Sequence, residues 1–114
     1  MEKDDRQLLL TTAWLFARHG QSVRARAMCE ALVEDDSADG ISAAALAELL
    51  LAEGEAERAL NVLAAAKFPP SLRRAEALLE TRALLALDRK RDADLRWQRY
   101  VASSQGRNRT WVKQ

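Results

Sequence analysis

Apolar residues recur every three or four positions along most of the chain, and short polar runs interrupt them. In the stretch that follows Gly20, the recurring positions are Val23, Ala27, Cys29, Leu32 and Val33. This spacing is typical of an α-helix with one apolar face. Alanine and leucine dominate the composition, whereas valine, isoleucine and threonine are few and scattered, which leaves little material for strands. The pattern therefore predicts an all-α protein.

The interruptions group the predicted helices into three pairs. The first helix begins near Asp4 or Asp5, either of which can cap the free amides of its first turn. Pro69 and Pro70 end the fourth helix and open the fifth, because proline lacks the N–H that a helix interior needs but is favoured at a helix start. With 114 residues the chain forms one domain. The predicted bounds are 1–106 for the domain, about 5–36, 41–68 and 70–104 for the pairs, and 107–114 for a C-terminal extension.

The helix pairs repeat at a fixed distance. Gly20 and Gly54 end the first helices of pairs one and two, and each is followed five residues later by an alanine. Asp88 follows Gly54 at the same distance that separates the two glycines, and it too has an alanine five residues later. This period is that of a tetratricopeptide repeat (TPR) of roughly 34 residues, a helical hairpin that must stack on copies of itself to bury its apolar face. The spacing predicts three TPR-like hairpins stacked as a short right-handed solenoid with a concave groove.

The positions at which such hairpins pack carry suitable residues in the first two units. They are Leu9, Ala13, Phe16, Gly20, Ala25, Cys29 and Leu32 in unit one, and Leu46, Ala47, Leu50, Gly54, Ala59, Leu63 and Ala66 in unit two. The third unit fits at Leu84, Ala93, Trp97, Tyr100 and Val101. Its first helix departs from the pattern, since Glu80 and Thr81 stand where an apolar and a small residue belong, unless the register slips by one. Asp88 also has to replace the turn glycine, which aspartate tolerates better than most residues.

Residues of each first helix that lie outside the packing positions should face the groove, where a partner could bind. The candidates for partner binding are Leu10, Trp14, Arg18, Ile41, Glu48, Leu51, Leu78, Arg82 and Leu85. Most are apolar, and an exposed apolar surface of this kind indicates a protein partner such as an amphipathic helix. Trp14 is the expected anchor, because tryptophan dominates binding hot spots. The alternative is that Trp14, like Leu10, Ile41 and Leu51, packs against the second hairpin or the C-terminal extension.

The balance of charge argues against binding to nucleic acids or to anionic membranes. Lysine and arginine number 18 and aspartate and glutamate 17, they are mixed along the chain, and the net charge is +1. No stretch approaches the ~20 apolar residues that span a bilayer. A single cysteine cannot form an internal disulfide, and the start MEKDDRQ is acidic where a secretory signal is basic. We expect a protein of the reducing cytoplasm that does not insert into membranes.

Residues that could support catalysis or bind a metal are scarce. One histidine, one cysteine, no glycine-rich loop and no carboxylate pair at a fixed spacing predict neither an enzyme nor a metal or cofactor site. Cys29 falls on a packing position and is predicted to be inert core, and His19 is predicted to stabilise a helix end. The run from Arg89 to Arg91 is predicted to be a solvated turn. Trp111 in the C-terminal extension either frays with the chain end or docks on the last hairpin.

Three segments together resemble the small TPR chaperones of bacterial type III secretion systems, most closely the YscY type. They are RQLLLTTAWLFARHGQSVRARAMCEALV, GEAERALNVL and DADLRWQRYV, which lie within residues 6–103. The adjacent Trp14 and Leu15 are the most specific part of the likeness. The resemblance implies a chaperone that keeps a small YscX-like export component soluble in the bacterial cytoplasm and contacts the inner-membrane export gate. The sibling YscG type instead holds the needle subunit with a small co-chaperone, and the sequence leaves both types open. In either case the residues implied to hold a helix of the client are Leu10, Trp14, Ile41 and Leu51.

The leading functional hypothesis is therefore a type III secretion chaperone that binds an apolar segment of its client before export. The alternative is a generic cytoplasmic TPR adaptor that links two proteins. A groove that clamps a C-terminal carboxylate would need several Lys, Arg and Asn side chains, and only Arg18 and Arg82 qualify. An RNA-binding helical repeat ranks third, because the near-neutral charge argues against it.

Overall fold

The computed structural model describes the backbone of residues 1–112 and the side chains of residues 1–104. Within that part of the chain the protein is all-α, as the sequence predicts. Its elements, in chain order, are α1 (Lys3–Arg18), α2 (Ser22–Asp35), α3 (Gly40–Ala52), α4 (Ala56–Ala65), the 3-10 turn η1 (Pro70–Leu72), α5 (Arg73–Ala86) and α6 (Lys90–Val112).

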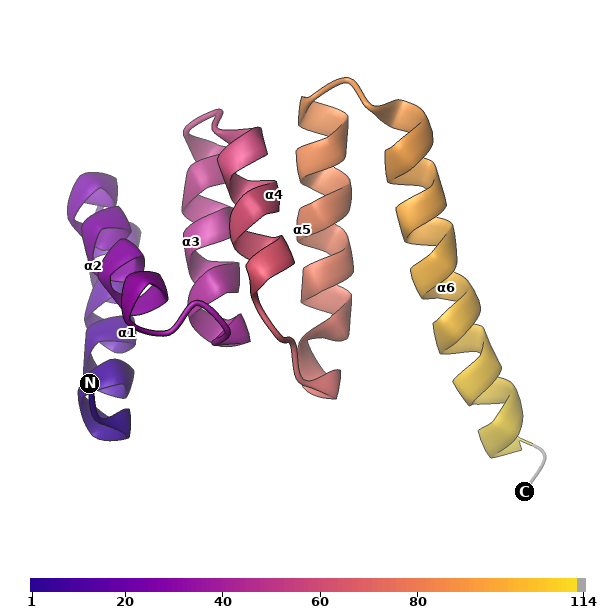
Figure 1. The fold of residues 1–114 in the computed structure, drawn as a ribbon, viewed down its shortest axis with the longest axis horizontal. Helices are drawn as coiled ribbons and strands as arrows, with labels where there is room; N and C mark the ends of the chain where they lie inside the picture. The colour runs from indigo at the N-terminus through magenta and orange to yellow at the C-terminus, as the bar shows by residue number, and fades with distance from the viewer. Residues whose placement is uncertain (113–114) are drawn as a thin grey trace.

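The helices form three hairpins, α1–α2, α3–α4 and α5–α6, that stand side by side (Figure 1). The second helix of each of the first two hairpins packs on the first helix of the next, so that α2 contacts α3 and α4 contacts α5. The first helices α3 and α5 also contact each other. The first hairpin and α6 lie at opposite ends of this row, and α6 leans away from α5 toward its C-terminal end (Figure 1).

Each first helix ends in the same turn, in which one residue adopts the left-handed backbone conformation. Gly20 has a φ of 77°, Gly54 a φ of 80° and Asp88 a φ of 59°, which confirms that aspartate replaces glycine in the third turn. In each turn the next backbone N–H donates to the carbonyl oxygen five residues earlier, as in a Schellman motif. These bonds of 2.8, 2.8 and 2.9 Å join Gln21 to Phe16, Glu55 to Leu50 and Arg89 to Leu84. All three turns therefore keep the spacing of the repeat at the ends of the first helices.

Two residues of the third hairpin, Glu80 and Thr81, depart from the repeat pattern, and Glu80 forms an ion pair with α6. Arg96 donates a hydrogen bond of 2.8 Å from Nε to Glu80, and both side chains are largely shielded from solvent. The hydroxyl of Thr81 is buried and has no hydrogen-bond partner among the described residues. The α5–α6 interface is thus partly ionic at positions where the α3–α4 hairpin carries Leu46 and Ala47.

The N-terminal end of α1 is not capped as the sequence predicts, and α3 is capped by a residue that the sequence analysis does not name. The side chain of Glu2, which precedes α1, makes no capping hydrogen bond, and Asp4 and Asp5 do not cap the helix. They lie inside its first turn, where their negative charges favour the positive end of the helix dipole. At the start of α3, the side chain of Asp39 accepts a hydrogen bond of 3.1 Å from the backbone N–H of Ile41.

Helix α4 ends at Ala65, three residues earlier than the predicted end at Phe68. The backbone becomes extended at Ala66. It is held there because the backbone N–H of Lys67 donates a hydrogen bond of 2.9 Å to the carbonyl of Ala38, in the loop before α3. The two segments pass so closely that a Cβ on Gly40 would lie 2.7 Å from the carbonyl oxygen of Lys67. Glycine is therefore required at this position.

Helix α6 continues through Val112, beyond the end of the third pair that was predicted near residue 104. The predicted extension, residues 107–114, is therefore helical as far as Val112. The side chain of Trp111 lies outside the described residues, so its docking stays a prediction.

A cluster of buried apolar residues connects the three hairpins. Its buried members are Ala13, Cys29, Leu46, Ala47, Leu50, Ala59, Leu63 and Leu79. Most are predicted packing positions of units one and two, so the sequence pattern located the core of these units correctly. Cys29 is 1% exposed, and burial, aided by the charge of Glu30, raises the pKa of its thiol. This environment agrees with the inert role predicted for it.

Candidate functional site: an apolar pocket between the first two hairpins

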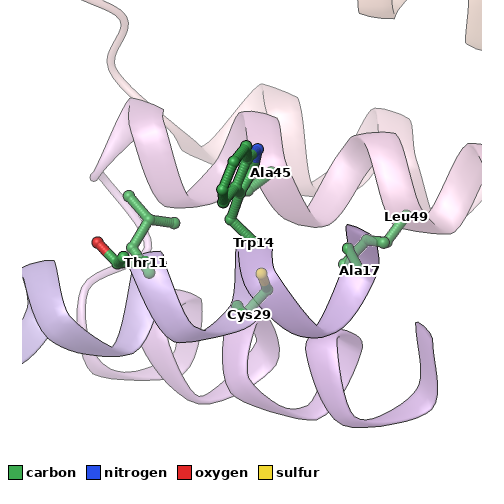
Figure 2. A pocket seen from close by; sticks show the side chains of 8 residues that line it. Thr11, Trp14, Ala17, Cys29, Ala45 and Leu49 are labelled. Carbon is green, nitrogen blue, oxygen red and sulfur yellow. The ribbon is translucent and has the colours of Figure 1, made fainter. Parts of the chain in front are cut away.

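A pocket of about 400 Å³ opens between helices α1, α2 and α3. Its lining residues are Leu10, Thr11, Ala13, Trp14 and Ala17 of α1, Cys29 of α2, and Ala45 and Leu49 of α3. Figure 2 shows the side chains of these helices converging, with the indole of Trp14 in the middle of the group. Nearly all of the lining is hydrocarbon, so the pocket suits an apolar group rather than an ion.

Trp14 forms a wall of this pocket and still leaves 56% of its surface exposed. The guanidinium carbon of Arg18, one turn further along α1, lies 4.9 Å from the centre of the Trp14 ring. This contact fixes a positive charge beside the apolar pocket. The exposure shows that the second hairpin covers Trp14 only in part, in contrast to the alternative in which the residue is packed away.

The pocket exists because α1 and α3 meet differently from α3 and α5. Ala45 and Leu79 are separated by one period of the repeat, so the two occupy equivalent positions on α3 and α5. Leu79 is 5% exposed and belongs to the common core, where it helps to close the contact between α5 and α3. At the preceding junction the smaller Ala45 lines an open pocket. The leucine-to-alanine difference therefore accounts for space between α1 and α3.

Two arginines form ion pairs between the first and the second hairpin, one near each end of α3. Arg6 donates hydrogen bonds of 2.7 Å to both Asp35 and Asp39, close to the start of α3. Arg26 of α2 forms ion pairs with Glu53 and with Glu55, at 2.7 Å from the latter, beyond the end of α3. These polar contacts hold both ends of the junction, so the helices need not close over the pocket to stay together.

The nine residues predicted to bind a partner lie on α1, α3 and α5, and we call them together the first-helix face. They are Leu10, Trp14, Arg18, Ile41, Glu48, Leu51, Leu78, Arg82 and Leu85. All are exposed except Leu10 and Leu51, whose side chains are half-buried, and none is fully buried. The structure brings Leu10 and Trp14 together in the pocket and places Arg18 against Trp14. The remaining apolar members lie outside the pocket lining, on α3 and α5.

The charges of the first-helix face are not equivalent. Trp14, Glu48 and Arg82 occupy the same position in consecutive units of the repeat. Arg82 donates a hydrogen bond of 2.9 Å from Nη1 to Glu48, so these two charges compensate each other. Arg18 has no carboxylate within ion-pair distance among the described side chains. An uncompensated positive charge therefore stands beside the pocket.

Sequence reasoning missed Ala45, Leu49 and Thr11 as lining residues and assigned Cys29 to the core alone. A signal for the pocket was present, since the residue at Ala45 could have been compared with its equivalent at Leu79. The space itself depends on how far apart α1 and α3 stand, which no single position reveals.

A second, polar pocket of about 340 Å³ lies between α5 and α6. Its lining residues are Phe68, Arg73, Glu76, Arg96, Arg99, Tyr100 and Ser103. Burial and the nearby carboxylate of Glu80 raise the pKa of Glu76, and the guanidinium of Arg96 opposes this shift.

The other residues singled out from the sequence lie outside both pockets. His19 directly follows the last residue of α1, and its backbone N–H donates to the carbonyl of Leu15 at 3.1 Å. In the third turn, Arg89 pairs with Asp92 at 2.9 Å and Lys90 lies 3.8 Å from Asp88. Among the side chains of residues 1–104, no group of three or more His, Cys, Asp and Glu residues is placed to hold a metal ion. None of the described helices has the length and apolar character needed to cross a membrane.

Comparison of the chain with protein-family models, with curated proteins and with solved structures finds no match.

Proposed function

We propose that this protein is a TPR-like chaperone that binds an apolar segment of a partner protein on its first-helix face. The observation that carries the proposal is the apolar pocket beside the half-exposed Trp14. A partner would bury this surface, and apolar burial is the main source of affinity in such complexes. An amphipathic helix is the partner shape that suits a row of parallel helix faces.

Three features support a TPR-like arrangement with this face on its concave side. The hairpins repeat at a constant period, their turns have the same backbone geometry, and each second helix packs on the next first helix. Repeats of this kind stack with a constant rotation and form a curved binding surface. The first helices then line the inner side, where the predicted partner-binding residues lie.

The resemblance of the sequence to type III secretion chaperones supplies the partner class. On this proposal the client is a small secreted component, either YscX-like or a needle subunit held with a co-chaperone, and the protein acts in the bacterial cytoplasm. Contact with the inner-membrane export gate would follow client binding. No chemical step is required, since the chaperone works by covering apolar surface until export.

The generic adaptor stays the alternative, with the same face and a partner unrelated to secretion. One version of it, a clamp for a C-terminal carboxylate, is disfavoured because Arg82 is already paired with Glu48. The two hypotheses separate by co-expression with each small candidate client, followed by size-exclusion chromatography. Failure of both client types to form a complex would contradict the secretion role.

The site itself is tested by Trp14→Ala, with Val23→Ala as the control, because Val23 is exposed on α2 outside the first-helix face. Trp14→Ala should keep the helical circular dichroism spectrum and weaken client binding by about 2 kcal/mol, or about thirtyfold in Kd. Val23→Ala should bind like the wild type. Equal binding by both variants would place the client elsewhere.

Salt dependence distinguishes this proposal from an RNA-binding repeat. A complex held by apolar contacts should survive raised salt, whereas one with a nucleic acid should weaken steeply as counterions compete for the phosphates. Kd values measured for the same complex at low and high salt decide between them.

A further inference from the structure

The two junctions between first helices differ at a pair of positions whose side-chain sizes are exchanged. On α5 the larger residue is Leu79 and the smaller is Ala83, and both are buried. On α3 the equivalent residues are Ala45 and Leu49, so the larger side chain stands one turn later. This exchange leaves the space beside Trp14 without the leucine that fills the corresponding place at the next junction.

We infer that this space receives one bulky apolar side chain of the partner, a leucine, methionine or phenylalanine, and that the partner carries an acidic residue about one helical turn away that faces Arg18. The inference rests on the proposed binding role of the first-helix face. It extends that role by stating which chemistry the partner must present.

The inferred apolar side chain of the partner follows from a comparison of the two junctions between first helices. At the α3–α5 junction the protein supplies the filling side chain itself, in Leu79. At the α1–α3 junction a partner side chain would complete the same kind of contact, against Trp14, Leu49 and Ala45. A pocket of about 400 Å³ lies at the lower end of the size range of known ligand sites, so it has room for a bulky apolar side chain but not for a whole helix.

The acidic half follows from charge complementarity. Arg18 is held over the Trp14 ring, so its charge has a defined place beside the pocket. The other two charges of the first-helix face, Glu48 and Arg82, are paired with each other. A single carboxylate on the partner therefore matches the charge of this surface. Further charged residues of the partner that face α3 and α5 would find no unpaired charge on the first-helix face.

A displayed library of helix-forming peptides with randomised surface positions tests both halves without knowledge of the natural client. Peptides selected on the wild-type protein should share one bulky apolar residue, with Asp or Glu three or four positions from it. Their affinities are then measured by calorimetry on Ala45→Leu, which places the missing leucine in the pocket. Binding should fall at least about tenfold on this variant.

Ala64→Leu is the matched control, because Ala64 is exposed on α4 and the same enlargement there leaves the pocket open. Arg18→Glu provides an independent arm, since Arg18 is exposed and its replacement does not touch the core. This variant should lose affinity for the selected peptides and regain it for a peptide whose acidic residue is changed to lysine.

Selected peptides that bind Ala45→Leu as tightly as the wild type, or that share no apolar anchor, would overturn the inference and leave the proposed function standing. If Arg18→Glu does not regain affinity for the lysine peptide, the inference that an acidic residue of the partner faces Arg18 is overturned. If no peptide is enriched and no candidate client binds, the proposed function fails, and the inference fails with it.

Discussion

Asp88 occupies in the third hairpin the left-handed position that Gly54 occupies in the second, with a φ of 59° against 80°. The following residue in each turn donates the same backbone hydrogen bond, to Leu84 and to Leu50 respectively. The turn geometry is therefore maintained although the residue that favours it is missing. Aspartate can adopt this conformation at a cost that glycine does not have.

Asp88→Gly should raise the free energy of unfolding by about 0.5–1 kcal/mol, because it relieves that backbone cost. The exposed ion pair between Asp88 and Lys90, at 3.8 Å, contributes little that would be lost. Urea denaturation measures the difference. As the converse control, Gly54→Ala should lower stability by about 1 kcal/mol through its φ alone, since a Cβ there would meet nothing within 4 Å. A destabilised Asp88→Gly variant would show that the aspartate side chain contributes more than its backbone costs.

The sequence predicts this turn, but not the pocket, for a physical reason. Turn chemistry is local, so the regular spacing of Gly20, Gly54 and Asp88 is enough to place the hairpins. Features made by segments distant in the sequence are not visible in this way. The early end of α4 depends on the contact of Lys67 with Ala38, and the pocket depends on the distance between α1 and α3.

Leu79→Ala should destabilise the protein by about 2–5 kcal/mol, because it removes a buried side chain and leaves a cavity between α3 and α5. It would make the second junction resemble the first. The control is Leu78→Ala on the same helix, which removes an exposed side chain and should cost less than about 1 kcal/mol. Chemical denaturation of the two variants gives the comparison. Similar losses for both would mean that Leu79 does not close the α3–α5 junction.

Arg6→Gln should destabilise the protein by about 1–2 kcal/mol at neutral pH, because Arg6 joins α1 to Asp35 and Asp39. Burial tends to raise the pKa of Asp39, but hydrogen bonds from Arg6, Ser42 and the Ile41 amide outweigh it, and the pKa lies below its usual range. A lowered pKa in the folded state means that the stabilisation is complete above the unfolded pKa of about 4 and is lost as pH falls through the folded value.

The difference between Arg6→Gln and the wild type should therefore shrink below about pH 3, when the aspartates are protonated. Denaturation curves at neutral and acidic pH measure this change. Arg58→Gln serves as the control, because Arg58 is half-exposed and lies 3.4 Å from Glu30 and from Glu55. Its effect should stay within about 0.5 kcal/mol at either pH. A pH-independent loss in Arg6→Gln would indicate packing by the arginine stem rather than its charge.

Glu76→Gln should stabilise the protein at neutral pH by a few tenths of a kcal/mol, a small value because solvent reaches much of the side chain. Burial and the neighbouring Glu80 raise the pKa of Glu76, so the folded state holds its proton more tightly than the unfolded state does. The ionised carboxylate therefore opposes folding once the pH exceeds the folded pKa, and the neutral glutamine removes that opposition.

Below about pH 4 the carboxyl of Glu76 is protonated in both the folded and the unfolded state, and the advantage of Glu76→Gln should vanish. Thermal unfolding of both proteins between pH 3 and 8 follows the difference, and an advantage that grows toward acid would reverse the sign assigned to Glu76.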